Sequence, residues 1–129
     1  MKRKALGLFA TFFKIGAFTF GGGYAMIPLI QREIVDKKQW ATNEDLLDII
    51  AIAESTPGPI AVNAATFIGS KIDGFLGALF ATLGVVLPSF ITIFAVSFAI
   101  AQFEHIKLVQ YAFTGIRAAV LALIIRALA

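Results

Sequence analysis

The chain has 129 residues, of which 59% are hydrophobic and 15% are charged, and its formal net charge is +3. A soluble domain usually has about 25% charged residues, so this chain has too few charged groups to cover a water-facing surface. No polar face remains for a basic stripe that would bind nucleic acid, and the lack of cysteine excludes disulfides and thiolate metal sites. The composition predicts an all-α, polytopic membrane protein: one domain, residues 1–129, with spanning segments of roughly 20 residues each.

The first apolar segment, residues 5–30, is interrupted by a run of glycines at residues 21–23. Each glycine inside a helix costs about 1 kcal/mol relative to alanine. The run therefore predicts a helix to about Phe20, a break, and a second helix from near Tyr24. Pro28 then falls in the first turns of that second helix, where proline is best tolerated.

Residues 31–45 are polar, and the sequence predicts a solvated loop here. Trp40 within it is typical of an aromatic anchor at the membrane interface. Thr42 is a good helix cap, and Glu44 and Asp45 behind it suit the positive end of a helix dipole. We therefore expect a helix to begin at the end of this stretch.

The next apolar stretch, residues 46–68, contains a Pro-Gly-Pro run at residues 57–59, which an α-helix cannot continue through. It predicts two half-helices, at about 46–54 and 59–69. Each would be only about 15 Å long, against a hydrocarbon core of about 30 Å. The pair is expected to form either one broken spanning helix or a re-entrant hairpin.

The last third of the chain predicts two more membrane helices. Residues 74–101 carry no charge and are long enough to span, and Pro88 in their middle predicts a kink. Residues 102–107 form a short polar turn, and residues 108–129 begin a further apolar helix. Because the sequence stops there without a polar tail, we expect the domain to be incomplete at its C-terminus.

The predicted breaks point to an anion. Irregular backbone at membrane depth is costly unless it lines a cavity, and broken helices of transporters direct half-helix N-termini at anionic substrates. Such an N-terminus offers unpaired amides and about half a positive charge. We expect an oxyanion to be held between the two turns by amides, by side-chain hydroxyl and amide groups, and by one lysine. The candidate residues are Lys14, Gly21, Gly22, Gly23, Ser55, Thr56, Pro57, Gly58, Pro59 and Asn63.

Other interpretations stay open for several of these residues. A glycine run is also typical of close helix packing, Lys14 could snorkel to the interface, and Asn63 could hydrogen-bond between helices. Glu54 lies inside an apolar stretch, where desolvation favours its protonated form. It is therefore a candidate for proton coupling, or it forms a structural pair with Lys14 or an arginine.

At this point the residues resemble a known family. The string FFKIGAFTFGGG at residues 12–23 is similar to the opening signature of the chromate ion transporters, and TPGPIAVN at residues 56–63 is similar to its second motif. The positions that complete the resemblance, in the family's order, are Pro28, Arg32, Trp40, Gly69, Gly74, Gly77, Ala78, Ala81, Thr82, Leu87, Pro88 and Ser89.

The resemblance implies a multi-pass carrier in the cell inner membrane that moves chromate, with sulfate as a competing or native substrate. It implies neither an enzyme nor a cofactor nor a metal site. It also implies that the chain is one half of an inverted-repeat transporter and works as a homodimer or beside a second short subunit. Arg32 joins Lys14 as a group expected to attract the oxyanion. The alternatives are a small-cation or drug exporter that uses Glu54, and a membrane assembly subunit that transports nothing.

The distribution of basic residues agrees with pairing in opposite orientations. Lys2, Arg3 and Lys4 precede the first segment, and the next polar stretch carries an equal number of basic residues, namely Arg32, Lys37 and Lys38. If the two groups lie on opposite faces of the membrane, the positive-inside rule gives little bias. A weak bias permits insertion in both orientations.

Overall fold

A computed structural model of the chain describes residues 2–129, with side chains from Lys4 onward. Lys2 and Arg3, which enter the charge comparison above, lie outside the described side chains. Every element in the described residues is a helix, which confirms the all-α class. The elements are α1 (Lys2–Phe18), α2 (Gly23–Ile30), the π-helix η1 (Gln31–Lys37), α3 (Asn43–Ser55), α4 (Ile60–Phe103) and α5 (Lys107–Leu128).

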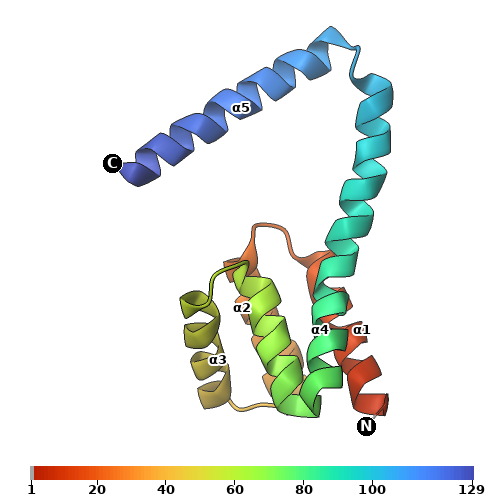
Figure 1. Ribbon diagram of the computed structural model, residues 1–129, viewed down its shortest axis with the longest axis vertical. Helices are drawn as coiled ribbons and strands as arrows, with labels where there is room; N and C mark the ends of the chain where they lie inside the picture. Colours follow the sequence, from red (N-terminus) through yellow and green to blue (C-terminus); the bar gives the residue numbers. More distant parts are fainter. Residues whose placement is uncertain (1) are drawn as a thin grey trace. The chain divides into compact units, whose positions relative to one another are not determined.

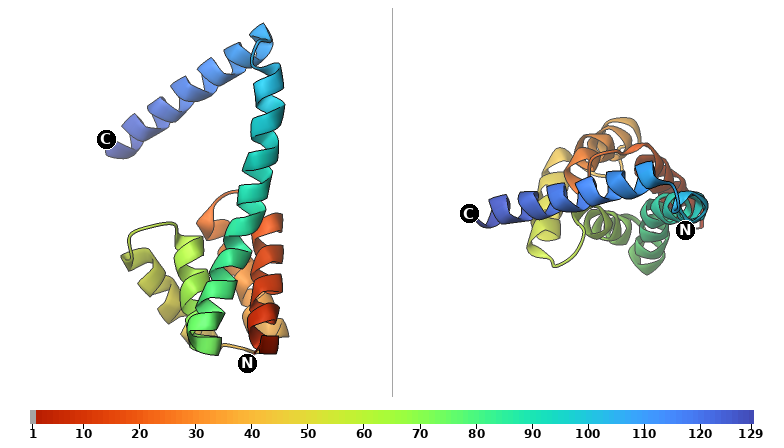
Figure 2. Two further views of the ribbon diagram at one scale, coloured as in Figure 1. Left: turned by 45° about the vertical axis from the view of Figure 1, so that its right-hand side comes forward. Right: turned by 90° about the horizontal axis from the view of Figure 1, so that it is seen from above.

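The chain divides into two compact units, Met1–Ile91 and Thr92–Ala129. In the first unit, α1, α2 with η1, α3 and most of α4 pack around an apolar core (Figures 1 and 2). The largest fully buried side chains of this core come from α1, α2, η1 and α4, and they are Leu8, Phe12, Ile30, Ile34 and Ile68.

The predicted glycine break is confirmed. α1 ends at Phe18 and α2 begins at Gly23. Between them Gly21 and Gly22 have φ angles of 119° and 91°, which L side chains rarely adopt. The run is therefore a true turn, because its backbone conformation requires glycine.

The predicted loop over residues 31–45 is wrong in its first half. Residues 31–37 are the π-helix η1, which continues α2 without interruption. Pro28 lies inside α2, and because it has no N–H it leaves the carbonyl of Tyr24 without the usual helical partner. Polarity alone does not distinguish a loop from a helix with solvated faces, so the sequence pattern missed this element.

The predicted start of α3 is confirmed in atomic detail by a capping box. The Asp45 N–H donates to the Thr42 hydroxyl at 3.1 Å, and the Thr42 N–H donates to the Asp45 carboxylate at 2.9 Å. Asp45 also pairs with Lys71 of α4. The Lys71 ammonium first, and the Thr42 groups second, lower the pKa of Asp45 to about 2. This contact ties the beginning of α3 to α4.

The Pro-Gly-Pro break is confirmed as well, since α3 ends at Ser55 and α4 begins at Ile60. α4 contains a second break, at Asp73 and Gly74, whose φ angles are −142° and 61°. It separates residues 60–72, about 20 Å long, from residues 75–103, about 43 Å long. The chain reverses at this break, which lies between the predicted segments 59–69 and 74–101. Pro88, where we expect a kink, keeps helical dihedral angles.

The two pieces of α4 and the helix α1 approach one another at glycines. Gly69 and Gly77 bring the two pieces of α4 into backbone contact. A methyl group added at Gly84 would lie 2.6 Å from the carbonyl oxygen of Phe9, and one added at Gly16 would lie 2.8 Å from that of Val85. Close backbone approach at small residues is the usual way in which membrane helices pack.

In the second unit α5 follows a short turn, as the sequence predicts, and has no buried residue. α4 and α5 are the two helices in the described residues that are long and apolar enough to cross a membrane. Their large apolar side chains are mostly exposed, among them Phe94, Phe98, Leu121 and Ile125. This distribution fits a membrane protein, whose apolar surface faces lipid.

The glycine contacts generate a stability prediction. Gly84→Ala should lower the free energy of unfolding by about 1–3 kcal/mol, because the added methyl group meets backbone that cannot move aside. The control is Gly115→Ala in α5, where an added methyl group has no atom within 4 Å. Thermal unfolding in detergent, followed by circular dichroism, compares the two variants. Equal melting temperatures would show that the α1–α4 contact is not tight.

Candidate functional site

The glycine turn and the Pro-Gly-Pro turn meet in the structure. A methyl group added at Gly23 would lie 3.2 Å from the backbone nitrogen of Ala61 and 3.3 Å from the Cβ atom of Ile60. The N-terminus of α2 therefore touches the N-terminus of α4, and both turns lie at the same end of the first unit (Figure 1). The two sequence motifs, more than 30 residues apart, form one local structure.

Asn63 holds the Pro-Gly-Pro turn in shape. Its side-chain amide donates to the carbonyl oxygens of Ala53 and Thr56, at 3.3 and 3.1 Å. Gly58 lies against this amide with a φ angle of 124°. Because both amide hydrogens are used within the protein, Asn63 has none left for a ligand in this conformation.

The hydroxyls of Ser55 and Thr56 are also used within the protein. Ser55 donates to the carbonyl oxygen of Ala51 at 2.9 Å, and Thr56 donates to that of Ile52 at 2.7 Å. A hydroxyl has one hydrogen to donate, so only lone pairs remain, and these repel an anion. Pro57 and Pro59 have no N–H. We call the glycine turn and the Pro-Gly-Pro turn together the paired turns. The donors available there are therefore backbone amides in the first turns of α2 and α4.

Glu54 lies beside these turns, at the end of α3. The nearby Glu54 carboxylate raises the pKa of the Tyr24 hydroxyl, which belongs to the first turn of α2. Both residues are exposed in the described chain. The ion pairs of the described residues do not include Glu54, so the predicted pairing with Lys14 or an arginine is absent there.

Lys14 and Arg32 line one cavity of about 300 Å³ between α1 and the α2–η1 helix. We call it the basic cavity. Three basic side chains and one acidic side chain contribute to it, beside an apolar wall. The lining residues are Lys14, Arg32, Glu33 and Lys37, with Ile15, Phe18 and Leu29.

Glu33 is the centre of this cavity's charge pattern. One oxygen, Oε1, accepts from Lys37 at 2.7 Å and from Lys14 at 3.3 Å. The Glu33 side chain is 12% exposed, whereas those of Lys14 and Lys37 are about half exposed. Lys37 first and Lys14 second lower the pKa of Glu33, and desolvation opposes them. In the described residues Arg32 makes no ion pair.

The predicted residues thus fall into two neighbouring groups. Phe18 ends α1 and lines the basic cavity, and Thr19 and Phe20 connect it to the glycine turn. Among the described residues no hydrogen bond or ion pair links Lys14 or Arg32 to the Pro-Gly-Pro turn. Sequence reasoning missed Glu33 and Lys37, because it read residues 31–45 as a loop. Their spacing of four residues would have suggested a pair on a helix.

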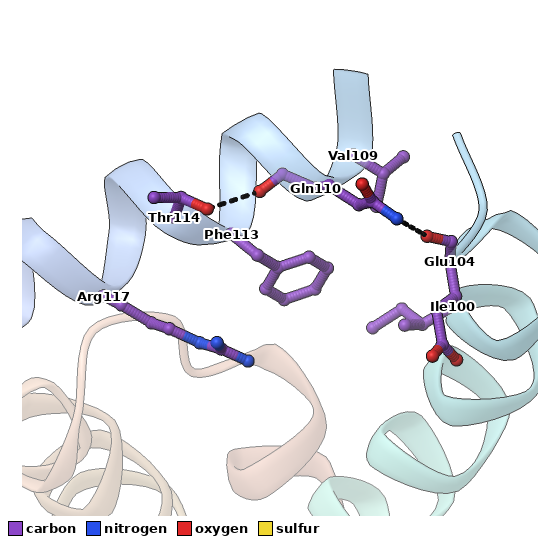
Figure 3. A pocket seen from close by; sticks show the side chains of 7 residues that line it. All are labelled: Ile100, Glu104, Val109, Gln110, Phe113, Thr114 and Arg117. Atoms are coloured by element: carbon purple, nitrogen blue, oxygen red, sulfur yellow. Dashed lines mark hydrogen bonds between the residues drawn. The ribbon is translucent and has the colours of Figure 1, made fainter. Parts of the chain in front are cut away.

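A second cavity, of about 380 Å³, lies in the second unit between the end of α4 and the start of α5 (Figure 3). Its one basic residue, Arg117, is matched by one acidic residue, Glu104. Gln110 donates to the backbone oxygen of Glu104 at 3.1 Å, and Thr114 donates to that of Gln110 at 2.9 Å. With no net charge, this cavity suits an anion less well than the basic cavity.

The role of Asn63 can be tested by its removal. Asn63→Ala loses two hydrogen bonds and should lower the free energy of unfolding by about 1–3 kcal/mol. Hydrogen exchange at Thr56, whose N–H donates to the carbonyl oxygen of Ile52 at 3.0 Å, should become faster as the turn loosens. The control is Asn43→Ala, which loses one exposed hydrogen bond from Gln31. Unchanged exchange in the Asn63 variant would show that the turn does not depend on this amide.

Comparison with known proteins agrees with the resemblance in the sequence. The family model described as "Chromate transporter" matches residues 6–129. The "Chromate transport protein" of Pseudomonas aeruginosa is 38% identical over 121 residues, which are 93% of this chain and 29% of that protein. The "Probable chromate transport protein" of Synechococcus elongatus is 33% identical over 113 residues, 88% of this chain and 29% of that protein.

A shorter relative is the "Uncharacterized transporter YwrB" of Bacillus subtilis. It is 37% identical over 100 residues, 78% of this chain and 51% of that protein. The chain thus spans under a third of the length of the first two relatives and about half of the third. No solved structure matches the chain.

Proposed function

Since this chain belongs to the chromate transporter family, we propose that it moves a tetrahedral oxyanion across the membrane, with chromate as substrate and sulfate as a competing or native substrate. The relative from Pseudomonas aeruginosa, which matches 93% of the chain, is called a chromate transport protein, and this supports chromate. We further propose that the chain is a multi-pass protein of the cell inner membrane and works as one half of an inverted-repeat transporter. Its partner would be a second copy or a paired short subunit.

The observation that carries the proposal is the basic cavity. It gathers Lys14 from α1 with Arg32 and Lys37 from η1. Three basic side chains and one carboxylate leave two net positive charges, which match the charge of a chromate or sulfate dianion. Ammonium and guanidinium groups bind such oxygens through charge-assisted hydrogen bonds. The cavity is also large enough for one small oxyanion with some of its water.

The paired turns support a second position for the anion. Gly22 has open space where a side chain would stand, and Gly23 beside it lies against the start of α4. Amides at such helix N-termini bind anions without a full charge. In the proposed path the anion is first held by Lys14 and Arg32 and then passes to the amides near Gly58. Glu54, next to these amides, would carry a proton that offsets the negative charge.

The proposal predicts the effect of removing one charge. Lys14→Gln and Arg32→Gln should each weaken sulfate and chromate binding about 10- to 100-fold, because each loses a charge-assisted contact. Lys107→Gln, the same change outside the basic cavity, is the control. Calorimetry in detergent measures binding, and flux in proteoliposomes with any partner half measures transport.

Each outcome separates the hypotheses. No flux of chromate or sulfate under a proton or voltage gradient would defeat oxyanion transport. Flux of a small cation that Glu54→Gln abolishes, with no competition from sulfate, would indicate the cation exporter instead. Sulfate binding that is equal in Lys14→Gln and Lys107→Gln would leave Lys14 a snorkelling residue at the interface.

A further inference from the structure

The basic cavity contains its own anion. The carboxylate of Glu33 occupies the position between Lys14 and Lys37, with both ammonium groups on the same oxygen. Its side chain is 12% exposed, although the lysines that hold it are about half exposed. A dianion that entered the cavity would need these same ammonium groups. Glu33 and the substrate therefore compete for one set of donors.

We infer that Glu33 is a displaceable internal counter-ion that makes the basic cavity selective for dianions over monoanions. This inference rests on the proposed function, since it concerns the same cavity. In the empty cavity the carboxylate neutralises part of the charge of Lys14 and Lys37. When a dianion binds, the two lysines move to it and Glu33 is released toward solvent. Arg32, which makes no ion pair in the described residues, also faces the dianion.

The selectivity follows from charge. A monoanion such as chloride brings one negative charge, so exchanging it for the carboxylate gains no Coulomb energy, and the tethered carboxylate keeps the advantage of its high effective concentration. A dianion such as sulfate brings two charges and gains about twice the attraction at the same distance. Exchange is then favourable for sulfate and unfavourable for chloride. Tetrahedral geometry adds to this, because separate oxygens can face Lys14, Lys37 and Arg32.

A merely structural role for Glu33 has the opposite signature. If the carboxylate only positions the two lysines, removing it frees them to point elsewhere, and sulfate binding becomes weaker. If it competes with the substrate, removing it makes sulfate binding tighter. The sign of the change therefore distinguishes a competitor from a positioning residue.

The test is sulfate and chloride binding by Glu33→Gln, measured by calorimetry on the full chain in detergent at fixed low ionic strength. The control is Asp36→Asn, because Asp36 is an exposed acid of the same helix η1 that does not line the cavity. Glu33→Gln should bind sulfate about tenfold more tightly than the wild type, since a like charge no longer opposes the ligand. Chloride should now compete with sulfate at concentrations that leave the wild type unaffected. Asp36→Asn should match the wild type in both respects.

Other results overturn the inference. The counter-ion role is refuted if Glu33→Gln binds sulfate no more tightly than Asp36→Asn does. The proposed function still stands in that case, provided that the wild type binds sulfate. No sulfate binding by either wild type or Glu33→Gln refutes both. If Glu33→Gln melts below 37 °C, Glu33→Asp replaces it: the charge is kept but the shorter side chain withdraws from the lysines, so sulfate should again bind more tightly. Unchanged affinity in Glu33→Asp would count against displacement.

Discussion

Close approach of backbones at glycines is the constraint on which the described arrangement depends. Lipid tails are as apolar as the helix surfaces, so the hydrophobic effect does not drive two helices together, and membrane helices associate through close packing. In this chain Gly84 meets Phe9, Gly16 meets Val85, and Gly23 meets the start of α4. The first two contacts fix α1 against the longer piece of α4. The third fixes α2 against the shorter piece. With α1 and α2 both held, Lys14 has a defined position opposite η1.

The helix ends at the paired turns carry partial charges of both signs, whereas the sequence suggested positive ends alone. Two helix N-termini lie there, but so do the C-terminal ends of α1 and α3, whose carbonyls carry partial negative charge. The hydroxyls reduce this conflict. Thr19 donates to Ile15, and Ser55 and Thr56 donate to the last turns of α3. They do not hold the anion in this conformation. Each hydroxyl offsets part of the partial negative charge of the carbonyl that accepts from it, and the Ile52 oxygen accepts the Thr56 N–H as well.

The sequence predicted the helix breaks and the helix cap, which depend on one or two neighbouring residues. Glycine and proline breaks, and the cap at Thr42, follow from the backbone preferences of single residues and were found where expected. The π-helix η1 was not predicted, because helices and loops at a membrane surface share polar composition. The contact from Lys14 to Glu33 joins residues 19 apart through tertiary packing, which no spacing rule reaches. The break at Asp73 and Gly74 falls between the predicted segments 59–69 and 74–101, which a short charged stretch separates in the sequence, whereas Pro88 keeps helical dihedral angles.

Binding and translocation have different structural requirements in this family member. The basic cavity is built from residues 14–37, a single helical hairpin, so its charge pattern lies wholly within this chain. Alternating access instead requires two arrangements of larger bodies around the site, and the chain spans only 29% of its chromate-transporting relative from Pseudomonas aeruginosa. On the proposed function, anion affinity is therefore expected of the chain by itself, whereas flux is expected only of an assembly with a second half. Loss of flux in a cavity variant identifies a binding defect only when affinity falls with it.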